Sequence, residues 1–287
     1  MSCYNENSYN RFGDFGGISL KKSQLLKKVL KIVRKSAKLM MRGFTLEEKD
    51  SPANIVTSAD IAVQNFLCKS LLPLVPNSAF FGEEGNEEVK NAEYLWVVDP
   101  IDGTTNFSRG ISECAISVAL IYKNEAILGV VYSPFRNEMY FAEKGKGAYL
   151  NDVRIETSKR GFESSLFCTA LCLYKKEYAE QCIDIIREIY KECADIRRFG
   201  SCALDMCHLA SGKCELFFEF RVYPWDYAGA YLILKEANGI VSSCHGEKLE
   251  FDRVTPIVAA NNVENYKKLA EVVDKFIPQI PYDERLR

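Results

Sequence analysis

The sequence predicts a mixed α/β (α+β) protein, with antiparallel strands in its first half and alternating strands and helices in its second. Residues 116–155 alternate β-rich runs with the turn signals KNE, SPFRN, KGKG and ND, which is typical of an antiparallel meander. From residue 165 onward, strand patterns alternate with helix patterns, which favours a sheet covered by helices on both faces.

Each expected element has a local signal. Apolar residues at helical spacing predict a first helix at 21–41, with Gly43 as its stop, and a second that opens near Ser58 and ends before Pro73. Apolar runs bounded by turn residues predict the strands, and amphipathic runs predict the later helices. The expected strands outside the meander are 79–82, 94–98, 165–170, 196–199, 215–220, 240–243 and 256–261; the expected later helices are 176–191, 201–210, 225–237 and 262–276.

The change of rhythm near residues 157–163 predicts two halves. We expect a loose N-terminal lead-in at 1–18, a metal-binding α+β half at 19–160, and an α/β half at 161–287 that contributes Asp226 and substrate contacts.

Composition excludes several classes of protein. Of the 287 residues, 47% are hydrophobic and 26% charged, which is typical of a globular chain, and the net charge of −2 gives no field that would gather nucleic acid or an acidic membrane. No apolar stretch is long enough to span a bilayer, and the polar N-terminus has no signal-peptide pattern. The eleven cysteines form no CxxC pair, which favours reduced thiols. We therefore expect a cytoplasmic protein with no membrane and no nucleic-acid partner.

The first expected helix differs from the slightly acidic average of the chain. The face of the first helix opposite its apolar residues is rich in lysine. A basic amphipathic helix can lie on a membrane. Because the whole chain is slightly acidic, an ordinary solvated face is the favoured interpretation.

The segment WVVDPIDGTTNF at 96–107 carries the clearest chemistry. A hydrophobic strand delivers Asp99 and Asp102 just past its end, where α/β proteins usually bind ligands. Two carboxylates three residues apart repel each other unless a positive charge lies between them, and Mg²⁺ prefers such oxygen ligands. The turn Gly103-Thr104-Thr105 can expose backbone N–H groups to a phosphate.

Two further acidic positions follow expected strands. Glu83-Glu84 comes after AFFG, and Asp226 opens a helix after ELFFEF. Taken alone, each is explained as a surface acid or a helix cap. Acids at three separate strand ends favour a metal-binding cluster.

Other catalytic classes lack their motifs. The chain has two histidines and no GxSxG, GxxxxGK[ST] or GxGxxG sequence. DPIDGTT differs by one residue of spacing from the DxDGT motif of phosphatases that form an aspartyl-phosphate. Attack by a metal-activated water fits better.

Six ordered segments together resemble the inositol monophosphatase family, the lithium-sensitive magnesium phosphatases, over about residues 21–262. They are NIVTSAD (54–60), FFGEE (80–84), WVVDPIDGTTNF, GVVYSP (129–134), KGKGAYLN (144–151) and PWDYAGA (224–230). The resemblance implies a layered αβαβα sandwich, two or three Mg²⁺ ions and inhibition by lithium. It leaves a homodimer open.

The resemblance also implies roles for the metal-site residues. Glu83, Asp99 and the Ile101 carbonyl would hold one ion. Asp99, Asp102 and Asp226 would hold a second, with a weaker third near Glu83. The catalytic set adds side chains that activate water: Thr104, oriented by Asp60, would assist Glu83, and Lys49 would lie near metal-bound waters.

The implied substrate site combines a phosphate subsite and a polyol subsite. Its members are Glu83, Ile101, Asp102, and the backbone of Gly103 and Thr104 on the phosphate side, and Gly200, Ser201, Cys202, Glu219 and Asp226 on the polyol side. The expected reaction is hydrolysis of myo-inositol monophosphate or a similar polyol or sugar monophosphate, a small-molecule phosphate ester.

Two alternatives stay open. A phosphatase for fructose bisphosphate or another phosphorylated metabolite would need basic side chains for a second anionic group, and the sequence offers Arg221 and Lys175-Lys176. A regulatory module that contacts protein or RNA is the alternative from a different class.

Overall fold

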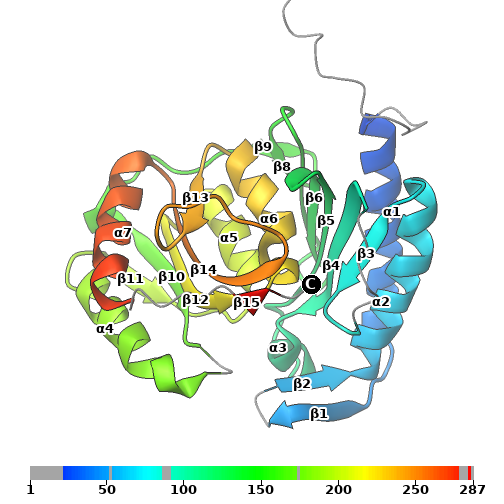
Figure 1. Cartoon of the computed structure of the whole chain (residues 1–287), viewed down its shortest axis with the longest axis horizontal. Coiled ribbons are helices and arrows are strands. Elements are labelled where there is room, and N and C mark those ends of the chain that lie inside the picture. The colour runs from blue at the N-terminus through cyan, green and yellow to red at the C-terminus, as the bar shows by residue number, and fades with distance from the viewer. Residues whose placement is uncertain (1–21, 52–53, 86–91, 173–174, 278–283, 286–287) are drawn as a thin grey trace, which may run out of the picture.

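The computed structural model describes residues 22–51, 54–85, 92–172, 175–277 and 284–285; the expected N-terminal lead-in lies outside these residues. In Figure 1 the described elements form five layers: helices α4 and α7, a first sheet, helices α5 and α6, a second sheet, and helices α1 and α2. This is the layered α/β sandwich that the sequence predicts.

The first half contains the meander. Its elements are α1 (Lys22–Met40), β1 (Leu46–Ser51), β2 (Asn54–Thr57), α2 (Ser58–Leu71), β3 (Ala79–Gly82), β4 (Tyr94–Asp102), α3 (Thr104–Ser108), β5 (Ala115–Tyr122), β6 (Glu125–Ser133), β7 (Glu138–Glu143), β8 (Ala148–Leu150) and β9 (Val153–Ile155). Strands β3 to β9 form a seven-stranded sheet in sequence order. Only β3 and β4 pair in parallel; the other neighbours are antiparallel.

The second half alternates strands and helices. Its elements are β10 (Leu166–Ala170), α4 (Ala179–Tyr190), β11 (Asp195–Arg197), α5 (Cys202–Ala210), β12 (Leu216–Val222), α6 (Pro224–Glu236), β13 (Ile240–Ser243), β14 (Arg253–Ala260), α7 (Val263–Phe276) and β15 (Glu284–Arg285). The sheet order is β11-β10-β12-β14-β13, with β15 paired to β14.

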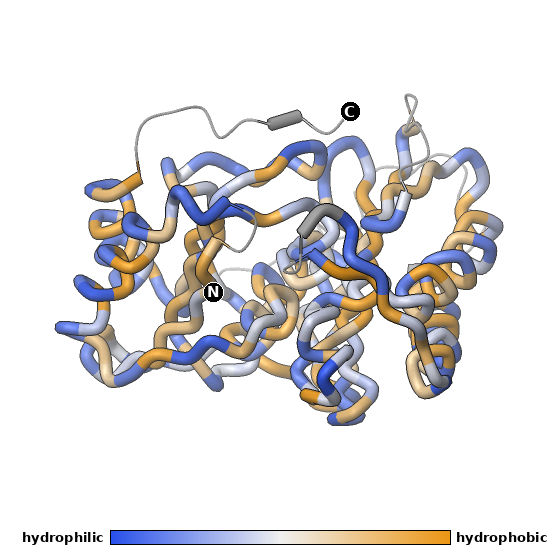
Figure 2. Tube along the Cα trace, turned by 90° about the horizontal axis from the view of Figure 1, so that it is seen from below, coloured by the Kyte–Doolittle hydropathy of each residue, from blue (hydrophilic) through white to orange (hydrophobic). Residues whose placement is uncertain are grey.

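Three apolar cores join the layers. One lies between the two sheets around α5 and α6, one between the seven-stranded sheet and α1 and α2, and one between the other sheet and α4 and α7. Figure 2 shows hydrophobic and hydrophilic residues alternating around the turns of the outer helices, because only one face of each helix contacts a core. Helix α6 approaches β6 so closely that a Cβ on Gly129 would lie 2.3 Å from the Gly229 carbonyl oxygen.

The structure corrects three expectations about elements. Strand β4 continues to Asp102 instead of ending at Val98, so Asp99 lies within the strand, and the pairing with β5 shifts register between Asp99 and Asp102. The hairpin of β1 and β2 was not expected, because LEEKDS has no alternation of apolar residues. The helix expected from Lys176 is a 3₁₀ turn at Lys176–Tyr178 followed by α4.

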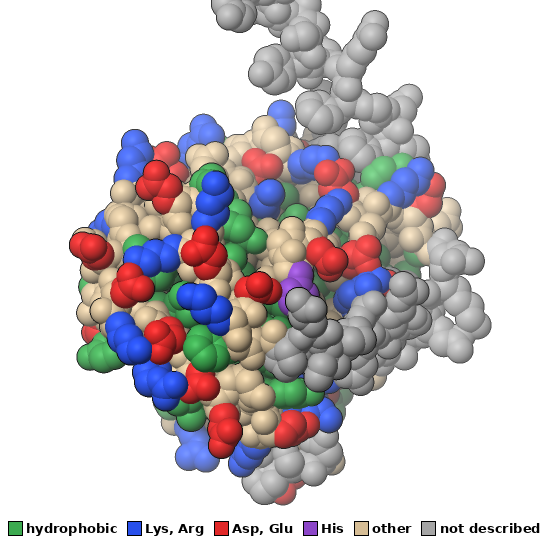
Figure 3. Space-filling model, turned by 60° about the vertical axis from the view of Figure 1, so that its left-hand side comes forward, with side chains coloured by type: hydrophobic (Ala, Val, Ile, Leu, Met, Phe, Trp, Pro, Cys, Tyr) green, Lys and Arg blue, Asp and Glu red, His purple; other side chains and the backbone are tan. Residues whose placement is uncertain are grey.

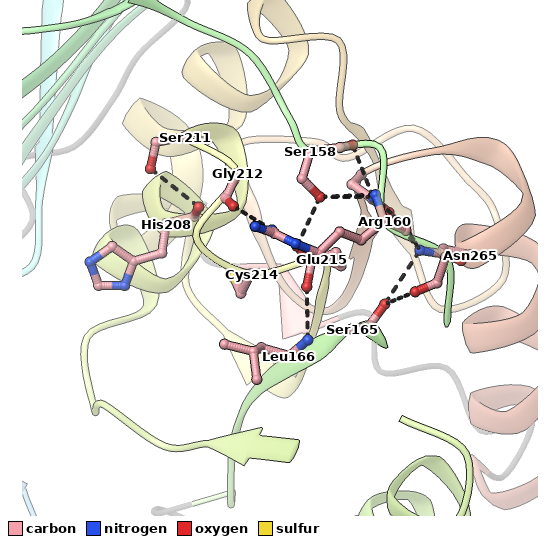
Figure 4. A network of polar contacts seen from close by, with 12 residues as sticks. Ser158, Arg160, Ser165, Leu166, His208, Ser211, Gly212, Cys214, Glu215 and Asn265 are labelled. Atoms are coloured by element: carbon pink, nitrogen blue, oxygen red, sulfur yellow. Dashed lines mark hydrogen bonds and ion pairs between the residues drawn. The ribbon is translucent and has the colours of Figure 1, made fainter. Parts of the chain in front are cut away.

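A buried polar network holds the segment between β9 and β10, where the two halves were expected to meet (Figure 4). The fully buried Glu215 carboxylate accepts hydrogen bonds from the Ser158 hydroxyl (2.8 Å), the Arg160 guanidinium (2.7 Å) and the Leu166 amide (2.8 Å). Asn265 of α7 donates to the Arg160 carbonyl (3.0 Å). The network fixes the connecting segment to β10, β12 and α7.

None of the ten described cysteines forms a disulfide bond with another described residue. Among the described residues, no helix combines the length and the apolar character that crossing a membrane requires.

Candidate active site

A pocket of about 340 Å³ gathers residues from both halves of the chain. Its lining residues come from the end of β4, the residue after β3, the start of α3, the loop before α5, β12 and the start of α6. Most residues that the sequence assigns to the site line this pocket: Glu83, Asp99, Ile101, Asp102, Gly103, Thr104, Gly200, Ser201, Cys202, Glu219 and Asp226. Asp60 and Lys49 do not line it, but each contacts a residue that does.

The three aspartate carboxylates of the pocket accept hydrogen bonds from neighbouring groups of the protein. Asp99 is 2% exposed and accepts the Ile101 amide at 2.9 Å. Asp102 is 7% exposed and accepts the Ser201 hydroxyl at 2.5 Å and the Ala203 amide at 2.7 Å, so it joins β4 to the start of α5. Asp226 accepts the Tyr223 amide at 2.8 Å at the start of α6. These bonds orient the carboxylates but leave each with further acceptor capacity.

Burial makes the acidic cluster electrostatically unfavourable in its charged form. It raises the pKa of Asp102 to about 6 and that of Glu83 to about 7, although Lys49 opposes the latter shift. Burial, followed by repulsion from Glu83, Asp102 and Asp226, raises the pKa of Asp99 well above its ordinary value. The pKa of Asp226 is raised well above its ordinary value by burial and by repulsion from Asp102 and Glu83. Within the described ranges, no lysine or arginine forms an ion pair with any of the three aspartates.

This donor set fits a hard divalent cation. Oxygen donors from β4, from α6 and from the residue that follows β3 share one pocket, and bound positive charge would relieve both their repulsion and their desolvation. In the described part of the chain, no group of three or more acidic, histidine or cysteine side chains is already arranged to hold an ion. Backbone amides, Ser201 and Lys49 occupy part of the acceptor capacity instead.

Among the described residues, Glu83 is the one acid of this cluster with a cationic partner. The Lys49 ammonium lies 3.2 Å from a Glu83 carboxylate oxygen and 2.6 Å from one of Glu84. Lys49 comes from the β1–β2 hairpin, so this hairpin, which the sequence did not predict, positions a residue that it did assign to the site.

Thr104 lies at the first position of α3 and connects two site elements. Its hydroxyl lies 2.9 Å from the Ile101 carbonyl and 3.3 Å from Asp60. Asp60 is fully buried, and it accepts the Thr57 amide at 2.8 Å in a capping box that opens α2. Burial, partly opposed by these hydrogen bonds, raises the pKa of Asp60 to about 6.

Gly103 is required by the turn that precedes α3. Its φ of 89° lies in the left-handed region, and a Cβ there would lie 2.8 Å from the Glu113 carbonyl oxygen and 3.1 Å from that of Gly200. A side chain at this position would therefore clash with two backbone segments. Glycine allows the β4–α3 turn to pack directly against the loop that carries Gly200.

Glu219 and Cys202, two of the residues expected to contact the polyol, also line the pocket. Glu219 of β12 lies near Cys202, and burial, followed by repulsion from Asp102, raises its pKa to about 8. Arg198 opposes that shift through its positive charge.

The same pocket contains basic residues that the sequence reasoning missed. Arg109 and Arg198 line it together with Arg221, whereas Lys175 and Lys176 do not. Arg109 follows the DPIDGTTNF segment by two residues, and Arg198 precedes Gly200 by two. Their closeness in sequence to segments already assigned to the site could have indicated that both arginines enter the pocket. Asp205 of α5 also lines the pocket.

Comparison with known proteins gives consistent results. A model of the inositol monophosphatase family matches residues 19–277. The Escherichia coli protein named Nus factor SuhB is 34% identical over 229 residues, which cover 77% of this chain and 86% of that protein. The structure of extragenic suppressor protein suhB from Bartonella henselae has a TM-score of 0.81 at 30% identity, covering 88% of this chain and 100% of the other. An IMPase structure from Thermotoga maritima has a TM-score of 0.79 at 30% identity, covering 88% and 98%.

Proposed function

Because the chain belongs to the inositol monophosphatase family, we propose that it is a Mg²⁺-dependent phosphatase that hydrolyses the monophosphate of a small polyol, such as myo-inositol monophosphate. The observation that carries the proposal is the pocket itself. It collects Glu83, Asp99, Asp102 and Asp226 from three separate elements, beside the N-terminal turn of α3. A phosphate ester bound through cations is the ligand class that suits such a site.

In this proposal the acidic cluster holds two or three ions. Glu83, Asp99, Asp102, Asp226 and the Ile101 carbonyl are the ligands. When bound, Mg²⁺ supplies the positive charge that neutralises phosphate oxygens and makes a water nucleophilic near neutral pH. This chemistry suits a pocket lined by carboxylates and by neither of the two histidines.

The chain's own groups position the substrate and handle the proton. The backbone N–H groups of Gly103 and Thr104 face the phosphate at the start of α3. The Thr104 hydroxyl accepts a hydrogen bond from the attacking water only when its own hydrogen is directed to another acceptor, and Asp60 Oδ1 at 3.3 Å and the Ile101 carbonyl at 2.9 Å are available. Glu83 lines the same pocket and helps Thr104 to activate the attacking water. Lys49 balances the negative charge of Glu83 and Glu84.

In this proposal the polyol contacts Ser201, Cys202 and Glu219. Ser201 is held by Asp102, and Glu219 and Cys202 lie beside it. A carboxyl group at Glu219 can accept hydrogen bonds from ring hydroxyls when charged, or exchange donor and acceptor roles when protonated.

A substrate panel with a Mg²⁺ titration tests the proposal. Inositol 1-phosphate, fructose 1,6-bisphosphate and a 3′-phosphoadenosine nucleotide should each be offered with chelator, with Mg²⁺, and with Mg²⁺ plus lithium. We expect Mg²⁺-dependent, lithium-inhibited turnover of inositol 1-phosphate. No turnover of any phosphate ester with Mg²⁺ would contradict the phosphatase assignment.

The pocket arginines favour one alternative substrate class. Arg109, Arg198 and Arg221 provide the basic groups that a second phosphate needs, and two of them were not anticipated. Preference for fructose 1,6-bisphosphate or for the nucleotide in the same panel would move the assignment to that class.

A second candidate function is regulatory. The Escherichia coli relative is named a Nus factor, and the alternative of a protein- or RNA-contacting role is compatible with an intact acidic cluster. Purification of the tagged protein from its own cells, with and without ribonuclease treatment, tests this role. Recovery of the protein without specific partners in both samples would count against it.

A further inference from the structure

Helix α1 presents a continuous basic face that the pocket chemistry does not use. Six cationic side chains are exposed along it: Lys27, Lys28, Lys31, Arg34, Lys35 and Lys38. The opposite face is apolar, and Leu25, Val29 and Val33 are at most 2% exposed. None of the six cations lines the pocket.

The cations follow a regular line. Lys27, Lys31, Arg34 and Lys38 recur at about one turn of an α-helix, and Lys28 and Lys35 form a second row beside them. At about 1.5 Å rise per residue, the first row extends for about 16 Å with one charge per turn of about 5.4 Å. Such a row can contact several consecutive negative charges of an extended polyanion.

Acidic side chains do not offset this row. Helix α1 contains seven basic and no acidic residues, while the whole chain has 37 basic against 39 acidic, so removing α1 changes the formal charge from −2 to −9. Among the residues that the structure describes, none of the six exposed cations is paired with a carboxylate. The neighbouring α2 adds the exposed Lys69, and its one acid, Asp60, is buried.

Other outer helices differ from α1. On the face that Figure 3 presents, basic and acidic side chains are interspersed. Arg187 of α4 pairs with Asp184, Lys191 at the C-terminal cap of α4 pairs with Glu188, and Lys268 of α7 pairs with Glu192. The charge segregation of α1 is therefore not shared by α4 and α7.

The chemistry of the face distinguishes among polyanionic partners. A membrane-bound amphipathic helix inserts its apolar face, but here that face is buried against the seven-stranded sheet and α2. Protein interfaces are depleted in lysine and enriched in aromatic residues at their centre, and the exposed row on α1 has no aromatic residue. Sequence-independent nucleic-acid binding relies on lysine and arginine contacts to phosphates.

We propose that the Lys27–Lys38 face of α1 binds the phosphate backbone of a nucleic acid. This differs from the expectation drawn from net charge, because a whole-chain value of −2 averages a cationic helix with an acidic remainder. The face and the pocket are separate, so the proposal does not depend on the phosphatase assignment.

Fluorescence anisotropy with a labelled 20-nucleotide single-stranded RNA of mixed sequence, titrated with the full chain at 50 to 300 mM KCl, tests it. If about four phosphates are contacted, the logarithm of the association constant should fall with the logarithm of the salt concentration with a slope of about −3. The variant K31Q/R34Q/K38Q should lose about two units of that slope and bind about tenfold or more weakly at the lowest salt. These exposed side chains have no described partner, so circular dichroism and thermal unfolding should match the wild type.

The matched control is R187Q/K191Q/K268Q, which removes the same number of charges from α4, its C-terminal cap and α7. We expect it to bind RNA like the wild type. Equal losses in both variants, or no binding by the wild type at 50 mM KCl, would overturn the proposal. Binding to phosphatidylserine vesicles without binding to RNA would also overturn it, and would assign the face to a lipid surface.

Discussion

Replacing Asp99 by asparagine tests whether the acidic cluster is built for cations, through stability as well as activity. Asparagine is nearly isosteric, and its oxygen can still accept the Ile101 amide, which lies 2.9 Å from Asp99. The substitution therefore removes one buried ionisable carboxyl from the group that also contains Glu83, Asp102 and Asp226. We expect turnover to fall by orders of magnitude because a shared ligand is lost.

The magnitude of the stability effect follows from the pKa shifts. A carboxyl whose pKa is raised by folding stabilises the folded state while protonated, and that stability is lost as pH rises through the raised pKa. For the buried Asp102, a rise from 3.8 to about 6 corresponds to about 3 kcal/mol. With Glu83 near 7 and Glu219 near 8, the metal-free protein should lose stability between about pH 4 and pH 8.

Differential scanning fluorimetry at pH 5 and pH 8, with chelator and with Mg²⁺, measures these effects. At a Mg²⁺ concentration 100 times Kd the wild type should gain about 2.7 kcal/mol, or roughly 5–10 °C in Tm. Metal-free Asp99→Asn should melt above the metal-free wild type at pH 8. The difference should shrink at pH 5, because the neighbouring Asp102 and Glu83, with pKa values raised to about 6 and about 7, are then largely protonated and repel a charge at Asp99 less.

The control is Asp152→Asn, an exposed aspartate in the turn between β8 and β9, which should behave like the wild type in every condition. If Asp99→Asn keeps the full Mg²⁺-dependent gain in Tm, Asp99 is not a ligand. If the wild type shows no gain at all, the cluster does not hold Mg²⁺.

Other parts of the structure give three further expectations. Glu215→Ala leaves Arg160, Ser158 and the buried Leu166 amide without their shared acceptor, so chemical denaturation should show a loss of about 1–3 kcal/mol, whereas Lys159→Ala at an exposed neighbouring position should change little. Gly103→Ala should lower both stability, by about 1–3 kcal/mol, and turnover, because φ is 89° and the Glu113 carbonyl leaves no room; unchanged kinetics and Tm would contradict the proposed turn. His208 is buried and its pKa is lowered to about 4, first by burial and then by Lys213, so the folded state should lose stability as pH falls from about 6.5 to 4; urea titrations should show a smaller loss for His208→Gln, and an identical pH profile would refute this assignment.

The sequence predicted most elements because their patterns are local. Helix α1 at Lys22–Met40 was expected at 21–41, since its apolar residues recur at helical spacing. The β1–β2 hairpin was missed because Leu46–Ser51 is almost entirely polar, and a strand with little burial leaves no alternating pattern. The end of β4 was misplaced because an aspartate at a strand end usually signals exposure, whereas Asp99 is buried in the pocket wall.

The sequence by itself determined which acidic residues lie next to which turns. Asp99, Asp102 and Gly103 lie within one short segment, so their chemistry is set by covalent order. Tertiary structure alone decided what faces them. Ser201 lies 99 residues from Asp102 and still donates to it, Lys49 reaches Glu83 from a hairpin without a sequence signal, and Arg109 and Arg198 enter the same pocket. The physical reason is that local periodicity records burial and turn geometry, while charge neighbours across a pocket depend on how two sheets pack.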